Sequence, residues 1–331
     1  MTASVAPLAT PSAGSASPAT SLPSLWSYLS PALDHIVRSP TDDNGKAPPI
    51  SVEWHMGIHT ATYNYFTTQS ESATTGHGLA AVQRDNGKAA TISGSDLYEQ
   101  LDKYYSDTAR ELLLDAPEDH TTLIQYLIPC FNRYNAGAAS INRLLNYVNR
   151  HYVKRAVDED KGWLRLNDVL DAVARNIKGD DTREKIAKKL KERRTVELKA
   201  WGYANGGSPE LMAQAESCAE AASTLDRIVP LSSLALRRFR TELLEPLLKA
   251  PKINGKGKKK RPPPGGGDMG SLPKGRLARA VKELLETSAG GEDEKRRIAA
   301  ELADMMKVCG VQADQPLRKK LEKYVIATAS I

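Results

Sequence analysis

Two histidines, His55 and His59, have the spacing that places both imidazoles on one face of a helix. Zinc proteases use this spacing together with a glutamate directly after the first histidine, which serves as the general base. Met56 occupies that position in this chain, and the nearby sequence suggests no third ligand. The pair therefore predicts a core or partner-facing role, and we expect neither a metal nor a cofactor.

The other patterns that could carry chemistry each lack a required member. The glycine-rich segment 265–271 has no Lys followed by Ser or Thr and no preceding strand, and a phosphate-binding loop requires both. The six histidines are scattered, so no Ser/His/Asp or Cys/His constellation can be assembled. We therefore expect a protein without a catalytic site.

The composition is that of a soluble globular protein in a reducing compartment. Hydrophobic residues make up 40% of the chain and charged residues 26%, with a net charge of +6. The three cysteines lie far apart without metal-ligand spacing, so a disulfide framework is not expected. No apolar run approaches the ~20 residues of a membrane helix, and the N-terminus has no secretory signal. A membrane partner is not expected.

One short run of basic residues lies within the segment 252–261, which ends in three lysines and an arginine. Such a run binds nucleic acid, directs nuclear import or forms a solvated linker. It contains no aromatic residue for base stacking, which argues against nucleic acid as a partner. A basic helical nucleic-acid-binding protein that uses residues 252–261 is the alternative function.

Apolar residues recur at helical spacing through most of the chain. One such face comprises Leu97, Leu101, Tyr104, Tyr105 and Leu112. The same spacing recurs in the segments 141–152, 166–177, 277–285, 298–309 and 317–324. No segment alternates apolar and polar residues over the length of a strand. The sequence therefore predicts an all-α protein with its helices packed in two bundles.

Three segments do not fit this helical pattern. Residues 1–23 are rich in Ala, Ser, Pro and Thr, which predicts a disordered tail. Residues 70–94 are polar and contain glycine, so they predict a long loop. Residues 251–273 combine proline and glycine, which predicts a linker. We also expect one long helix over 134–155, preceded by a kink or break at Pro129.

The stretch 54–67 is unusually dense in aromatic residues and presents two apolar stripes on a helix. The first stripe comprises Trp54, Ile58, Ala61 and Tyr65. The second comprises His55, His59, Thr62 and Phe66, with Met56 and Tyr63 beside it. A helix with two apolar faces is either a buried core helix or binds a partner with one face. The His and Tyr side chains favour the interface.

This stretch resembles the second helix of the cullin N-terminus, which typically reads Leu-Tyr-x-x-Val-Tyr-Asn-Tyr-Cys-Thr and aligns with residues 58–67. Residues 145–155 resemble the family's Tyr-Leu-Asn-Arg-His-Trp-Val-Arg-Arg. Residues 97–104 fit its Leu-Tyr-x-x-Leu helix, and residues 281–310 are more weakly similar to its second helix pair. The chain thus resembles the N-terminal region of cullins, closely over 24–155 and loosely over 228–330.

The resemblance implies stacked five-helix cullin repeats. The expected division is a tail at 1–23, a first repeat at 24–155, and a second repeat at 156–331 with an insertion at 165–227. It also implies a non-catalytic scaffold of a cullin-RING ubiquitin ligase, acting in ubiquitin-dependent protein degradation in the cytoplasm and nucleus. The C-terminal cullin homology region has no counterpart here, so we expect no RING subunit and no ligase competence of this chain alone.

The Tyr-Asn-Tyr-x-Thr form is most similar to cullins that use a Skp-type BTB-fold adaptor and an F-box protein. By position, the resemblance implies two sets of adaptor contacts. The first set is His55, Met56, His59, Thr62, Tyr63 and Phe66, and the second is Asp119, His120 and Leu123. The family usually has Tyr at the position of His59 and Val at that of Thr62. Both differences reduce apolar contact with an adaptor.

Overall fold

The computed structural model describes residues 21–42, 45–75, 94–179, 181–204, 206–250, 275–286 and 291–329. These residues form helices and connecting loops and contain no strand, which confirms the all-α prediction. The expected linker at 251–273 and the basic run at 252–261 lie outside the described residues. Residues 1–20 of the expected tail also lie outside the described residues, whereas Leu22 and Pro23 belong to the first helix.

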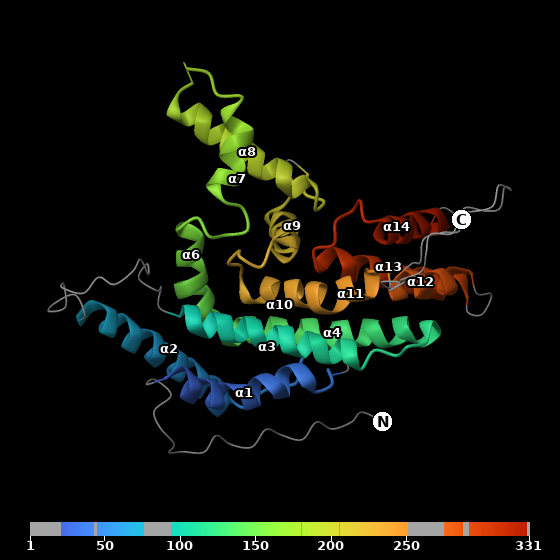
Figure 1. The fold of residues 1–331 in the computed structure, drawn as a ribbon, viewed down its shortest axis with the longest axis horizontal. Helices are drawn as coiled ribbons and strands as arrows, with labels where there is room; N and C mark the ends of the chain where they lie inside the picture. Colours follow the sequence, from blue (N-terminus) through green and yellow to red (C-terminus); the bar gives the residue numbers. More distant parts are fainter. Residues whose placement is uncertain are drawn as a thin grey trace, which may run out of the picture.

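The N-terminal half of the chain forms two layers of long helices, followed by short helical segments (Figure 1). In chain order these are α1 (Leu22–Arg38), α2 (Val52–Thr75), α3 (Ser95–Leu114), α4 (His120–Leu144), α5 (Asn146–Val148), the π-helical turn η1 (Asn149–Val153) and α6 (Lys154–Asp158). The helix α2 continues to Thr75, so it extends into the loop predicted at 70–94.

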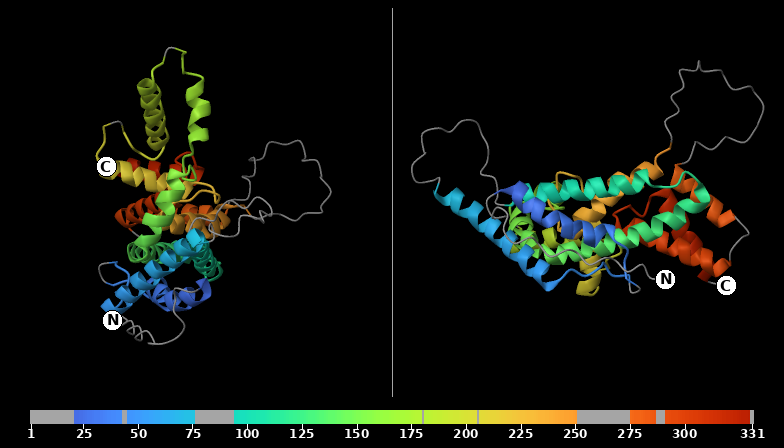
Figure 2. Two further views of the ribbon diagram at one scale, coloured as in Figure 1. Left: turned by 90° about the vertical axis from the view of Figure 1, so that its left-hand side faces the viewer. Right: turned by 90° about the horizontal axis from the view of Figure 1, so that it is seen from below.

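The C-terminal half packs above α3 and α4 in the view of Figure 1. Its helices are α7 (Leu166–Ala174), α8 (Arg183–Lys199), α9 (Pro209–Ala222), α10 (Leu231–Phe239), the π-helical turn η2 (Arg240–Leu244), α11 (Glu245–Leu248), α12 (Arg276–Glu286), α13 (Glu292–Val308) and α14 (Pro316–Ala329). The helices α7 and α8 project from the rest of the molecule, as Figure 1 and the left view of Figure 2 show.

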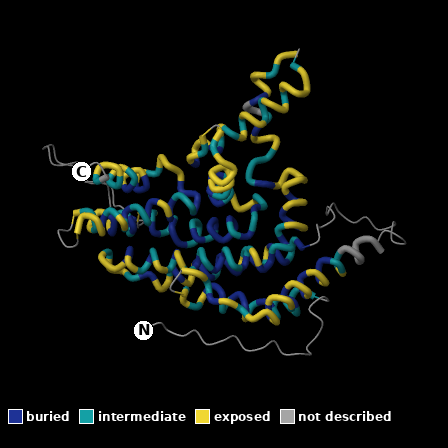
Figure 3. The backbone as a smooth tube through the Cα atoms, turned by 180° about the vertical axis from the view of Figure 1, so that it is seen from behind, coloured by how far each residue is buried: buried dark blue, intermediate teal, exposed yellow. Residues whose placement is uncertain are grey.

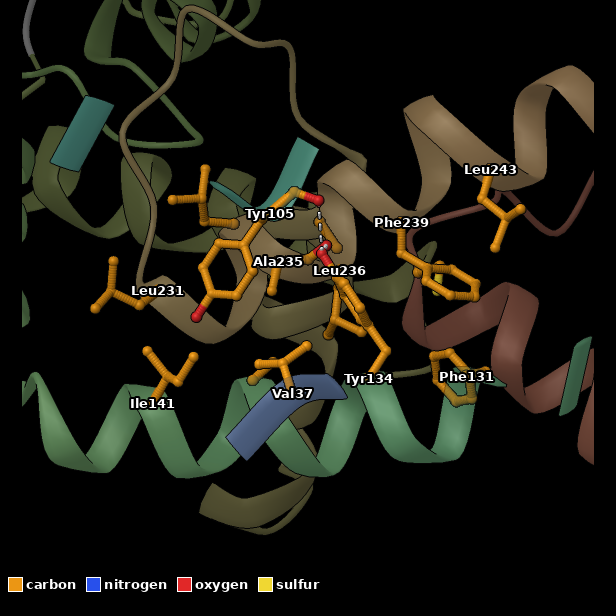
Figure 4. Packing of buried hydrophobic residues seen from close by; sticks show 14 of the residues in the cluster. Val37, Tyr105, Phe131, Tyr134, Ile141, Leu231, Ala235, Leu236, Phe239 and Leu243 are labelled. Atoms are coloured by element: carbon orange, nitrogen blue, oxygen red, sulfur yellow. Dashed lines mark hydrogen bonds between the residues drawn. The ribbon is translucent and has the colours of Figure 1, made fainter. Parts of the chain in front are cut away.

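The centre of the core lies where α10 packs on α3 and α4 (Figure 4). The Tyr134 hydroxyl on α4 donates to the main-chain oxygen of Ala235 on α10 at 3.1 Å and contacts that of Tyr105 on α3 at 3.3 Å. The ring of Phe239 lies 5.3 Å from that of Phe131 and 5.2 Å from that of Tyr134. Buried tyrosine hydroxyls usually find a hydrogen-bond partner, and the contacts of Tyr134 join α3, α4 and α10.

The two predicted repeats share one hydrophobic core. A single cluster of buried residues runs from Leu25 on α1 to Leu321 on α14. Because α10 packs against both α3 and α4, the expected boundary at residue 155 separates segments that bury each other's apolar surface. The division into repeats at that residue stays a prediction.

The segment 165–227, expected as an insertion, contains the three helices α7, α8 and α9. It carries a small hydrophobic cluster of its own, comprising Leu198, Trp201, Ala215, Cys218 and Ala219. Trp163 packs against this cluster and also against the main core. The apolar side chains of segment 165–227 therefore form a second, smaller core beside the main one.

The long helix predicted over 134–155 is interrupted at Leu145, where the backbone leaves helical geometry (φ −99°, ψ 29°). The turn η1 follows within the same stretch. In contrast, α4 runs through Pro129 without a break, so an interruption at Pro129 was wrong, and the kink stays a prediction. The interruption at Leu145 sets α5 apart from α4.

Candidate protein-binding surface

The helix α2 begins at a serine cap and packs one stripe inward. The Ser51 hydroxyl accepts a hydrogen bond from the Trp54 backbone N–H at 3.3 Å, as N-cap side chains do. Trp54 and Ile58 are buried, and the Trp54 ring lies 5.3 Å from that of Tyr28 on α1. At Gly57 an added Cβ would lie 2.1 Å from the Tyr28 hydroxyl, so α1 and α2 approach closely there.

The opposite side of α2 exposes a row of apolar side chains. Val52, Met56 and Tyr63 are 78%, 58% and 48% exposed, and their spacing places them on one helical face. His55 and His59 are exposed beside them. Figure 3 shows this alternation of buried and exposed positions along the helix. A row of exposed apolar residues on one helix face marks an interaction surface.

Tyr147 on α5 meets this face of α2 with its ring. The centroid of the Tyr147 ring lies 6.4 Å from that of His59, 5.7 Å from that of Tyr63 and 5.2 Å from that of Phe66, with edge-to-face planes in each case. The His151 imidazole stacks on Tyr147 at 3.9 Å. Exposed residues of α2 and of the α5–η1 segment thus form one continuous area. We define the α2–α5 surface by six side chains: the exposed His55, Met56, His59, Tyr63 and His151, and the half-buried Tyr147.

Two asparagines hold the α5–η1 segment against α10. The Asn149 side-chain amide donates to the Asn142 side-chain oxygen at 2.8 Å. The first backbone N–H groups of α10 are satisfied by the same pair, since Leu231 donates to Asn149 at 3.0 Å and Ser232 to Asn142 at 3.2 Å. Helix starts need such acceptors. The bonds fix the position of Tyr147 relative to the core.

The other end of α2 is fastened to the start of α3. The Asp96 carboxylate accepts hydrogen bonds from the Tyr65 hydroxyl and from the Gln69 amide, the latter at 3.0 Å. Burial, together with the hydrogen bond to Asp96, raises the pKa of the Tyr65 phenol above its ordinary range. The Phe66 ring rests on Gly94, where an added Cβ would lie 2.3 Å from it. These contacts hold α2 in place against the start of α3 and so fix the orientation of its exposed face.

Thr62 and Phe66 were expected to contact an adaptor, but they are only 1% and 4% exposed. They follow Ile58 by four and eight residues, so they continue the buried stripe of α2 rather than the exposed one. These two side chains therefore lie in the core of the free chain, and the expected contact set stays a prediction. In this arrangement Phe66 supports Tyr147 from below, and the residues of the first set that remain exposed are His55, Met56, His59 and Tyr63.

The second expected contact set does not come near α2. Leu123 is fully buried and His120 half-buried, which leaves Asp119 exposed. Asp119 caps α4, and a hydrogen bond from the Thr121 hydroxyl lowers the pKa of its carboxyl. These residues begin α4, whereas α5 follows its other end, about 36 Å away for a helix of this length. Figure 1 shows the start of α4 at the opposite end of the molecule from α2.

Tyr147 and His151 were not among the residues that sequence reasoning assigned to a surface. They lie in the stretch 145–155 that resembles cullins, which overlaps the segment 141–152 with apolar residues at helical spacing. Tyr147 and His151 stand four residues apart on another side of that stretch. Their spacing was the available signal, although only the fold shows that α2 lies beside them.

The described residues offer no group of three or more His, Cys, Asp or Glu side chains that could hold a metal ion. None of the helices in the described ranges is long and apolar enough to cross a bilayer.

A family model for the cullin α-solenoid domain matches residues 26–328. Curated relatives include Cell division control protein 53 of Saccharomyces cerevisiae, 23% identical over 145 residues. They also include Cullin-1 of Dictyostelium discoideum, 26% identical over 141 residues. Each alignment covers 42% of this chain and only 17% of the relative. No solved structure shows a significant match to the chain.

Proposed function

Because this chain belongs to the cullin family, we propose that it is a non-catalytic scaffold subunit of a cullin-type ubiquitin ligase. We further propose that its α2–α5 surface binds a Skp-type BTB-fold adaptor, which in turn carries an F-box protein. One observation carries the proposal: Met56 and Tyr63 stand exposed on one face of α2, and the Tyr63 ring meets the ring of Tyr147 on α5.

The chemistry of the surface fits a protein partner. Its side chains are aromatic, thioether and imidazole groups, which suit a partner with apolar pockets and a polar rim. None of its six side chains is a lysine or arginine, although Arg150 and Lys154 are exposed in the same stretch of chain as Tyr147 and His151. Tyrosine and methionine are also the residue types enriched in interface cores.

The supporting contacts make the surface preorganised. Phe66 and Gly94 lie beneath the aromatic rings, and Asn149 fixes the α5–η1 segment to α10. A partner that docks on rigid helices loses less conformational entropy than one that must order a loop. This support favours a permanent docking site over a surface that forms only on binding.

The two departures from the usual cullin pattern have unequal consequences. Thr62 is buried, so its replacement of the usual valine changes the support of α2 rather than the contact area. His59 is exposed and meets Tyr147 edge to face, so its replacement of the usual tyrosine changes the contact area itself. We therefore expect His59 to set which adaptor is preferred.

The test is calorimetric titration of the purified chain with a purified complex of a Skp-type adaptor and an F-box protein. We expect micromolar or tighter binding, and we expect Met56→Asp to weaken it at least tenfold because a carboxylate is placed in an apolar contact. Leu114→Asp is the matched control, since Leu114 is 83% exposed on α3, outside the surface. Absent binding by the folded chain, or equal binding by both variants, contradicts the proposal.

A further inference from the structure

A cleft of about 480 Å³ lies between the ends of α8 and α9 and the loop that joins α13 to α14. Trp163 and Trp201 line it together with the carboxylates of Glu197 and Asp314. Its volume is within the range of sites that hold a small ligand or a side chain. The cleft is built from other elements than the α2–α5 surface, so it is not part of the proposed adaptor site.

The walls of the cleft are anchored. The Trp163 indole N–H donates to the Glu216 carboxylate at 3.2 Å, and Arg194 pairs with the same carboxylate. Gly310, at φ +80°, lets the α13–α14 loop lie directly on the end of α9, because an added Cβ would come within 2.3 Å of the Ala222 nitrogen. The cleft is therefore formed by backbone contact as well as by side-chain packing.

The lining has one sign of charge. The residues that line it include two carboxylates and no lysine or arginine, and the ammonium of Lys307 lies outside the lining, 3.7 Å from an added Cβ at Gly202. Glu197 pairs with Arg193 at 2.5 Å, but both side chains are 38% exposed, and such surface pairs contribute little and are readily shared. Asp314 is exposed and forms no ion pair with the other described residues. Negative charge beside tryptophan is the combination that attracts a cation to an aromatic wall.

We propose that this cleft binds an arginine side chain presented by a partner protein. The planar guanidinium stacks on aromatic faces and forks onto carboxylates, whereas a lysine ammonium is a strongly hydrated point charge. The tryptophans supply the apolar contact, and Glu197 and Asp314 supply the acceptors. The inference goes beyond the proposed function, since it adds a second docking point on the opposite half of the chain from α2.

The test uses the full chain labelled with 5-fluorotryptophan, whose ¹⁹F signals report on the four tryptophans separately. A blocked Gly-Ser-Arg-Ser-Gly peptide should shift the Trp163 and Trp201 signals, with a dissociation constant below about 1 mM. The signals of Trp26 and Trp54, which lie in α1 and α2, should not move. The same peptide with citrulline or lysine in place of arginine should bind at least fivefold more weakly.

Variants connect the binding to the cleft. Asp314→Asn should weaken the arginine peptide about fivefold, because a charge-assisted hydrogen bond becomes a neutral one. Asp158→Asn is the matched control, an exposed aspartate at the end of α6. Equal affinity for the arginine and citrulline peptides, an unchanged affinity of Asp314→Asn, or shifts at Trp26 and Trp54 alone would overturn the proposal. Lysine binding as tight as arginine would overturn the choice of arginine.

Discussion

The ring of Tyr63 on α2 meets the ring of Tyr147 on α5 edge to face, with 5.7 Å between the centroids and 80° between the planes. The pairing makes one surface from two segments that are far apart in sequence. Edge-to-face aromatic pairs contribute about 0.5–1.5 kcal/mol beyond the area they bury. The pair therefore orients both rings in the free protein, before any partner arrives.

The first prediction concerns this pair. Tyr63→Ala and Tyr147→Ala should each weaken adaptor binding at least tenfold, since tyrosines that a partner buries in a complex are frequent anchors of protein interfaces. The double variant should lose less than the sum of the two single losses, because each single change already releases the other ring. Calorimetric titration of the four proteins with the adaptor complex measures the coupling.

Thermal unfolding followed by circular dichroism separates binding from folding. Tyr63 is 48% exposed, so Tyr63→Ala should lower the melting temperature only slightly. A loss of stability as large as that of a core truncation would place Tyr63 in the core and remove it from the interface. Additive losses in the double variant would show that the two rings act independently.

The helical pattern of the sequence was sufficient for the fold class and for most helices, but not for the faces of α2. Ile58, Thr62 and Phe66 share one side of the helix, and the sequence alone could not show how wide the buried stripe is. The width of that stripe depends on α1, α4 and α5, which pack against α2. Sequence reasoning placed Thr62 among the adaptor contacts by its position in the cullin pattern. The structure buries its side chain, since it lies on the same side of the helix as Ile58.

Sequence reasoning also could not place the second contact element. The start of α4 and the α5–η1 segment both carry plausible contact residues, such as His120 and Tyr147. Only the interruption at Leu145 and the antiparallel course of α3 and α4 decide which of them lies beside α2. These are properties of tertiary packing, which periodicity does not encode.

The second prediction concerns a largely buried ion pair between α3 and α10. The Arg238 guanidinium donates to Asp102 through two nitrogens, one at 2.7 Å, and these bonds raise the pKa of Arg238 above its ordinary value. Asp102→Ala should lower the free energy of unfolding by about 2 kcal/mol, because it leaves a largely buried guanidinium with fewer acceptors. Urea unfolding measures the change.

Asp107→Ala provides the matched control on the same helix. Its carboxylate contacts Arg110 at 3.5 Å, with both side chains about half exposed, so the loss should stay below about 0.5 kcal/mol. Both variants change helix propensity equally. Equal losses would mean that the Asp102–Arg238 pair contributes no more than a surface pair.

The third prediction concerns the glycine beneath Phe66. Gly94 has φ +91°, and a Cβ there would lie 2.3 Å from the Phe66 ring. Gly94→Ala should lower stability by more than 1 kcal/mol from backbone strain and overlap. It should also weaken adaptor binding, because displacing Phe66 moves the support of Tyr147.

Gly179→Ala is the control for this change, since nothing lies within 4 Å of its added Cβ and its φ is not positive. Melting temperature and calorimetric affinity should both stay close to the unaltered chain. Retained affinity in a destabilised Gly94→Ala protein would show that the adaptor surface does not depend on Phe66.

The last prediction concerns the pH dependence of stability. Burial raises the pKa of Glu220 on α9 from 4.5 to about 7, although the Ser233 hydroxyl donates to it at 2.6 Å. Between these two pH values the folded chain holds this proton and the unfolded chain does not, so unfolding releases it. The free energy of unfolding contributed by Glu220 therefore falls as pH rises from about 4.5 to 7, and the loss is complete above that range.

Glu220→Gln replaces the protonated carboxyl with a neutral group of the same shape, so it should remove this slope. Urea unfolding at pH 8 should find the variant more stable than the unaltered chain by about 1–3 kcal/mol, with most of the difference gone at pH 5. The exposed Glu118→Gln variant should follow the unaltered chain at every pH. If the Glu220→Gln curve runs parallel to that of the unaltered chain, the carboxyl of Glu220 is ionised in the folded protein at neutral pH, and the α9–α10 contact accommodates its charge.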